Sequence, residues 1–180
     1  MLDDVDRVTF VRRVAAIGGA CGWTLHTACL LDTHYHGIVE TSEPNLGRGM
    51  QRLLGGYAWI FNHRHGRDGH LFHGPFWSRR VHDDAHLLTA CVYVVLNPAA
   101  AGLCRHPSDW LWSSYREIVS GRGSDRLLGL FGDSPTQRIG RYVQVVDEAT
   151  ALVIERRAED GRSVWEASRT VVRQERLGSG

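Results

Sequence analysis

Apolar positions in the first part of the chain recur at helical spacing. Between Asp3 and Gly22 they fall three or four residues apart, as on one face of an amphipathic helix, at Val5, Val8, Val11, Val14, Ala15 and Ile17. Asp3 and Asp4 stand where a helix start favours a capping side chain and negative charge, and the glycines up to Gly22 mark its end. The pattern predicts a helix from Asp3 to Gly22.

Two strand-like segments follow this helix. Trp23–Cys29 and His34–Thr41 are short and separated by a turn, so they predict an antiparallel hairpin. Side chains two residues apart in a strand point to the same face, which places His34 and His36 together and Tyr35 opposite. Two imidazoles on one face can hold a metal ion, although two half-exposed strand histidines without a metal give the same pattern.

The central part of the chain predicts a second helix and another strand. An apolar stripe runs through Leu46–Asn62. Gly55-Gly56 within it indicates a close packing contact, because a glycine costs a helix about 1 kcal/mol relative to alanine. A further strand is predicted around Phe76–Val81.

A third helix is predicted over about Ala85–Leu96, after a cap that Asp83-Asp84 supplies. Tyr93 lies within it and Asn97 follows four residues later, so both side chains can face the same side. Pro98 is expected to end or bend the helix. Taken alone, Tyr93 is a core or interface tyrosine and Asn97 a helix-end residue.

The chain changes character after Tyr115. Asp125–Phe131 and Pro135–Val146 predict short helices, and the residues from Asp147 onward predict a long one. We therefore expect a first domain at residues 1–119 and a helical C-terminal extension at residues 120–180.

Composition sets the broad class of the protein. Hydrophobic residues make up 43% of the 180 residues and charged residues 23%, which suits a packed core and argues against wholesale disorder. The cysteines form no Cys-x-x-Cys pair, which argues against a zinc knuckle and a secreted disulfide framework. With no signal peptide and no apolar run of transmembrane length, a cytoplasmic protein without a membrane partner is expected.

Positive charge is concentrated in one window of a nearly neutral chain. Between Asn45 and Arg80 the only acid is Asp68, and the arginines are Arg48, Arg52, Arg64, Arg67, Arg79 and Arg80. Such a window is either a solvated face or a surface that binds the phosphates of DNA. We treat these six arginines as candidate DNA-binding residues.

Several runs then occur in an order and at separations that resemble one family. They are His34-Tyr35-His36, Glu43-Pro44-Asn45-Leu46-Gly47-Arg48-Gly49-Met50-Gln51-Arg52-Leu53, Phe61-Asn62-His63-Arg64-His65-Gly66, Gly69-His70-Leu71-Phe72-His73-Gly74, Tyr93-Val94-Val95-Leu96-Asn97-Pro98, Ala101-Gly102-Leu103 and Trp112-Ser113-Ser114-Tyr115. The chain resembles the single-tyrosine transposases of the HUH (His–hydrophobic–His) class, and most of all the REP-associated tyrosine transposases. The resemblance covers about Met1 to Val119, and more loosely extends to about Val143.

The resemblance implies both a fold and an activity. The fold is α+β, with a ferredoxin-like antiparallel sheet and helices on one face of it. The activity is that of a metal-dependent transposase, which cleaves and rejoins single-stranded DNA at hairpin-bearing repeats through a 5′-phosphotyrosine, usually as a homodimer. By position, Tyr93 matches the nucleophile, His34 and His36 match the metal-binding pair, and Asn97 matches a further polar ligand. The implied ion is Mg²⁺ or Mn²⁺.

One departure from the family concerns the first strand. The family carries a strand ahead of its first helix, whereas here a helix is predicted from Asp3, so that strand is expected to be missing. Two alternatives to an active transposase stay open. One is an N-terminally truncated, inactive DNA-binding remnant that recognises repeat hairpins through the arginines. The other is a metal-dependent hydrolase unrelated to DNA.

Overall fold

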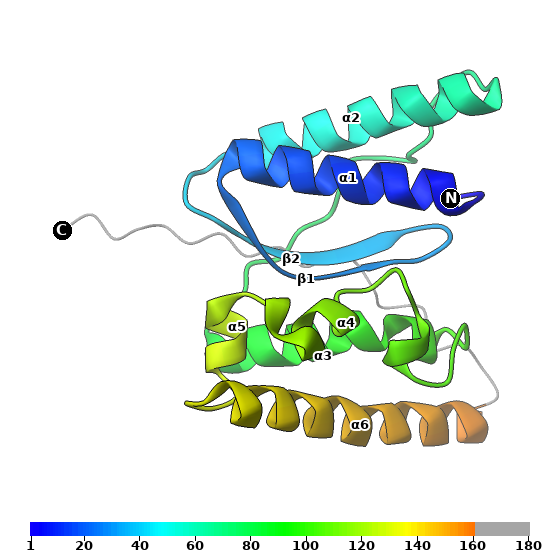
Figure 1. Ribbon diagram of the computed structural model, residues 1–180. Coiled ribbons are helices and arrows are strands. Elements are labelled where there is room, and N and C mark those ends of the chain that lie inside the picture. The colour runs from blue at the N-terminus through cyan, green and yellow to red at the C-terminus, as the bar shows by residue number, and fades with distance from the viewer. Residues whose placement is uncertain (161–180) are drawn as a thin grey trace.

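The computed structural model describes residues 1–160 of the chain (Figure 1). The longer elements are α1 (Asp4–Cys21), β1 (Trp23–Leu30), β2 (Tyr35–Thr41), α2 (Leu46–His65), α3 (Asp84–Ala100) and α6 (Pro135–Asp160). The shorter ones are η1 (Pro107–Asp109), α4 (Tyr115–Glu117), η2 (Ile118–Arg122) and α5 (Asp125–Gly129). The prediction of an α+β protein is confirmed in this general form.

α1 begins and ends where its sequence predicts. The side chain of Asp3 accepts a hydrogen bond of 2.9 Å from the Asp6 N–H, which satisfies one of the unbonded donors of the first turn. At the other end Gly22 takes a left-handed conformation, with φ of 66°, and its N–H bonds back to the carbonyls of Gly18 and Gly19.

β1 and β2 form the predicted antiparallel hairpin, with His36 opposite Cys29 and Tyr35 opposite Leu30. Within residues 1–160 the sheet has these two strands. The outer edge of β1 is covered, because the Leu30 N–H donates to the Trp112 carbonyl at 2.7 Å and Ser114 bonds to Ala28. The ferredoxin-like arrangement therefore stays a prediction.

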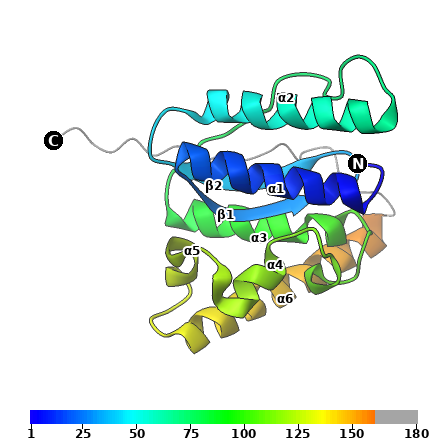
Figure 2. The same cartoon turned by 45° about the horizontal axis from the view of Figure 1, so that its top comes forward.

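Helices cover both faces of this hairpin, which corrects the expectation of helices on one face. α1 and α2 lie on one side, and α3 lies with α6 on the other (Figures 1 and 2). Alternate strand residues supply two cores: Val39 is buried with α1 and α2, whereas Ile38 is buried with α3. A strand that is apolar on both faces has to be covered on both faces.

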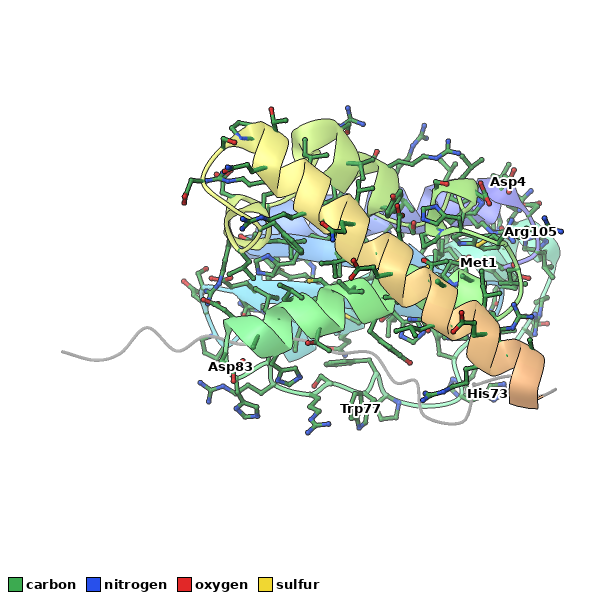
Figure 3. All side chains as sticks on the ribbon, turned by 90° about the horizontal axis from the view of Figure 1, so that it is seen from below. Met1, Asp4, His73, Trp77, Asp83 and Arg105 are labelled. Carbon is green, nitrogen blue, oxygen red and sulfur yellow. The ribbon has the colours of Figure 1, made fainter. Side chains whose placement is uncertain are left out.

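The segment between α2 and α3 contains no strand, so the prediction of one around Phe76–Val81 is wrong. Phe76 packs against the core of α1 and α2, whereas Val81 is buried in the core of α3. The segment therefore crosses from one layer to the other. Figure 3 shows this stretch passing from His73 through Trp77 to Asp83 at the start of α3.

α3 is longer than predicted, because it continues through Pro98 to Ala100. α6 is one helix from Pro135 to Asp160, without the predicted break at Asp147. The part of the predicted long helix at residues 161–180 lies outside the described residues.

α6 packs along α3 (Figure 3). Tyr142 and Val146 of α6 are fully buried in the same core as α3, together with Ile118 and Leu127. The proposed domain division between residues 119 and 120 stays a prediction, and this core contains residues from both sides of it. Among residues 1–160, no helix is both long enough and apolar enough to cross a membrane.

Candidate functional site

The hairpin brings the two predicted metal ligands together. His36 lies on β2 and is 1% exposed, and it shares its face with Ile38, the side that α3 covers. His34 lies in the turn just before β2, where its carbonyl accepts a hydrogen bond from the Leu31 N–H. The two imidazole rings are 4.9 Å apart between centroids and nearly perpendicular. The two imidazoles lie close together although β2 begins at Tyr35, so that His34, predicted as its first residue, lies outside the strand.

Both imidazoles are held in the form that can bind a metal. Burial lowers the pKa of His36 to about 4, and repulsion from His34 adds to the effect. Burial also lowers the pKa of His34. A neutral imidazole keeps a nitrogen lone pair for a metal ion, whereas a protonated one does not. The donor set therefore fits a divalent cation at neutral pH.

Tyr93 faces this pair from α3. Its ring lies 6.3 Å from the ring of His36, edge to face, and its side chain is 40% exposed. Burial raises the pKa of the Tyr93 phenol, so the hydroxyl is protonated at neutral pH. The predicted nucleophile and the predicted metal pair thus come from different elements and meet on one side of the hairpin.

Asn97 is buried one turn beyond Tyr93 and bonds to its own helix. Its Nδ2 donates to the carbonyl of Tyr93 at 2.8 Å and to that of Val94 at 3.3 Å. Pro98 has no N–H, so it cannot give the Val94 carbonyl its usual partner four residues on. The Asn97 amide supplies a donor to that carbonyl, and α3 continues past the proline to Ala100. The role of Asn97 as a metal ligand stays a prediction, and would use the amide oxygen.

The six arginines are all exposed and lie on α2, just after it, and in the segment before α3. Arg48 and Arg52 are exposed on α2, and Arg79 and Arg80 are exposed in the segment before α3. The Arg67 guanidinium lies over the ring of Phe61, 5.8 Å from its centroid. Their role in binding DNA stays a prediction.

Arg64 has a structural partner set that the sequence did not reveal. Its guanidinium pairs with Asp3 at 2.6 Å and with Asp6 at 2.6 Å, and His65 lies 2.9 Å from Asp6. Asp3, Asp6 and His65 are close enough to hold a metal ion, with ligand atoms within 4.8 Å of one another. Because Arg64 already balances the two carboxylates, we interpret the group as an ion-pair cluster that joins the start of α1 to the end of α2.

A second buried polar group ties α5 to the hairpin. His26 is 2% exposed, and its Nδ1 lies 2.7 Å from Ser124 Oγ while its Nε2 lies 2.9 Å from Glu40 Oε2. Ser124 Oγ also accepts the Leu127 N–H at 3.3 Å, so the serine caps α5. His26 and Ser124 are 98 positions apart, and no sequence pattern links a histidine in a strand to a serine at that distance.

Comparison with known proteins adds no relative to this picture. No protein-family model matches the chain. No curated protein matches it, and no solved structure matches it either.

Proposed function

We propose that this protein is a metal-dependent transposase that cleaves and rejoins single-stranded DNA, with Tyr93 as the nucleophile. The observation that carries the proposal is the approach of Tyr93 to His36, with ring centroids 6.3 Å apart, from a helix and a strand. The motif resemblance names the same residues independently of their spacing in three dimensions. We further propose hairpin-bearing DNA as the substrate and a homodimer as the working form.

In this proposal the Tyr93 oxygen attacks the scissile phosphorus, and the bond from phosphorus to the 3′ oxygen breaks. The products are a 5′-phosphotyrosine and a free 3′ hydroxyl. Because burial raises the pKa of Tyr93, the phenol is not ionised beforehand. Its proton passes to solvent water as the new bond forms, and the departing 3′ oxygen takes up a proton from solvent. The strand end can then be rejoined by attack of a 3′ hydroxyl on the same phosphorus, which breaks the bond from phosphorus to the Tyr93 oxygen; the hydroxyl loses its proton and the phenol of Tyr93 is restored.

His34 and His36 would hold the divalent cation, Mg²⁺ or Mn²⁺. When bound, the cation supplies positive charge that offsets the charge developing on the phosphate oxygens. His36 lies on β2 and is 1% exposed, so its imidazole is held in place by its neighbours. Imidazole ligands favour Mn²⁺ over Mg²⁺.

A DNA-cleavage assay tests the proposal. Full-length protein is incubated with a labelled single strand that folds into a hairpin, with Mg²⁺ or Mn²⁺, and resolved on a denaturing gel. A covalent protein–DNA adduct is expected for the wild type and not for Tyr93→Phe. Tyr142→Phe is the matched control, because the Tyr142 hydroxyl is buried in the core of α3 and α6. If no adduct forms with any hairpin substrate, the transposase proposal is wrong.

A DNA-binding protein without cleavage activity is the second candidate. It is favoured by the exposed arginines Arg48, Arg52, Arg79 and Arg80, which can bind phosphates whether or not the histidine pair holds a metal. This candidate predicts that affinity for hairpin DNA falls steeply with salt, because arginines that bind phosphates displace counterions from the DNA. It also predicts that Tyr93→Phe binds as the wild type does and that neither protein forms an adduct.

A further inference from the structure

The outer face of α2 carries a row of basic and aromatic side chains. The residues are Arg48, Arg52, Trp59 and His63, which we call the α2 stripe. Their spacing of four, seven and four residues puts them on one side of the helix. The opposite side is buried in the core, through Met50, Leu53, Tyr57 and Phe61. All four residues of the stripe are exposed.

Trp59 is the most unusual member of the stripe. Its side chain is 70% exposed, although an indole of this size usually contributes to a core. Its ring is parallel to that of His63, with an angle of 2° between the planes and 5.6 Å between centroids. The two stacked rings form an aromatic platform on the surface, which does not serve the core beneath α2.

The charge along α2 is positive. α2 contains no acidic residue from Leu46 to His65. A further guanidinium lies beside the stripe, because Arg13 of α1 donates to the carbonyls of Arg52 and Leu53. Arg13 can cross α2 there because Gly56 has no side chain: a Cβ on Gly56 would fall 1.8 Å from the Arg13 Nη2.

We propose that the α2 stripe binds single-stranded DNA, with bases stacked on Trp59 and His63 and phosphates held by Arg48 and Arg52. Aromatic platforms interleaved with cations are the surfaces that bind single strands, because every base has a flat face and every linkage a charge. A duplex keeps its bases stacked inside, and would leave Trp59 without a partner. From Arg48 to His63 the stripe spans about 22 Å, at 1.5 Å per helical residue.

This inference rests on the proposed function, since it names a second DNA contact for the same substrate. The stripe lies on the helix farthest from α6, whereas Tyr93 lies on α3 across the hairpin (Figure 1). A strand held there would be anchored away from the scissile phosphate. The contact would then add affinity without taking part in the chemistry.

Binding is tested by fluorescence anisotropy with full-length protein and a short labelled single-stranded DNA, at several salt concentrations and without a metal. Trp59→Ala is expected to weaken binding by at least about fivefold, from the loss of one stacking contact. Trp59→Phe is expected to retain most of the affinity. Arg48→Gln and Arg52→Gln are each expected to reduce the slope of log affinity against log salt by about 0.7. Leu152→Ala is the matched control, an equally exposed apolar side chain on α6.

The outcomes separate this inference from the proposed activity. If Trp59→Ala binds within twofold of the wild type while its thermal midpoint is unchanged, the stripe is not a DNA site. Equal or tighter binding to RNA of the same sequence would also overturn the assignment to DNA. If the wild type forms no adduct but Trp59→Ala still loses affinity, only the transposase proposal fails. If the adduct forms and Trp59→Ala binds normally, only the stripe proposal fails.

Discussion

The side-chain amide of Asn97 donates to the carbonyl of Val94, at 3.3 Å, where Pro98 provides no backbone donor. Removing the amide leaves a buried carbonyl without its partner, which costs about 1–3 kcal/mol. We therefore expect Asn97→Ala to lower the free energy of unfolding by that amount in urea titrations without metal. In a Pro98→Ala background the backbone N–H returns, and Asn97→Ala should cost clearly less. Equal costs in the two backgrounds would contradict this account.

Two neighbouring glycines of α2 should respond differently to alanine. A Cβ on Gly55 meets nothing within 4 Å, whereas one on Gly56 would meet the guanidinium of Arg13. Gly55→Ala is expected to raise the free energy of unfolding by about 1 kcal/mol, through helix propensity. Gly56→Ala displaces Arg13 from the carbonyls of Arg52 and Leu53, so its gain should be lost or reversed.

Thermal and urea unfolding measure both glycine variants. The control is Arg13→Ala, in which Gly56→Ala should become as stabilising as Gly55→Ala. If Gly56→Ala stabilises the wild type as much as Gly55→Ala does, the contact with Arg13 does not matter for stability.

Low pH should weaken the ion-pair cluster that joins the start of α1 to the end of α2, and so lower the free energy of unfolding. Burial would raise the pKa of Asp6, but hydrogen bonds from His65, the Leu2 N–H and Arg64 outweigh it and lower the pKa. The folded state then binds fewer protons than the unfolded state around pH 4, so stability rises with pH there. The contribution of Asp6 is present above its unfolded pKa and is lost as the pH falls through the lower folded value.

Asp6→Asn removes this contribution. Unfolding titrations between about pH 2 and pH 6 should show a shallower rise in stability for Asp6→Asn than for the wild type. Arg64→Gln should lie between the two, and Arg12→Gln, an exposed arginine of α1, should follow the wild type. A slope in Asp6→Asn equal to that of the wild type would contradict the prediction.

Metal binding at the histidine pair should be visible without DNA. Mn²⁺ at a hundred times its dissociation constant stabilises a protein that binds it only when folded by about 2.7 kcal/mol. We expect Mn²⁺ to raise the thermal midpoint of the wild type, EDTA to reverse the shift, and His34→Asn to abolish it. His73→Asn, at an exposed histidine, is the control. An undiminished shift in His34→Asn would place the ion elsewhere.

Local patterns account for most of the elements. Asp3 and Gly22 mark the ends of α1 because capping is a short-range effect, and the hairpin follows from alternation and a turn. The close contact indicated by the two glycines is present at Gly56 and not at Gly55, since only the face toward Arg13 meets α1. The continuation of α3 past Pro98 was not predicted, because a proline within a helix ordinarily ends or bends it.

The polar contacts that the sequence did not reveal are long-range. Arg64 meets Asp3 from 61 residues away, and His26 meets Ser124 from 98 residues away. Neither pair has a periodicity or a motif, so only the packing of α1 on α2, and of α5 on the hairpin, brings them together. The histidine pair and Tyr93 could be named together from the sequence because motifs in the order of a known family identify them. No distance between them has to be known for this.

Strand register has a consequence for the site. β2 turns Val39 toward α1 and Ile38 toward α3, and His36 shares the side of Ile38 because it faces Cys29 across the ladder. Sliding β2 by one residue would exchange the two sides and carry the imidazole away from Tyr93. The alignment of two strands is thus what decides whether the histidine and the tyrosine meet. Substitutions that shift the register of the hairpin would therefore separate His36 from Tyr93 without replacing either residue.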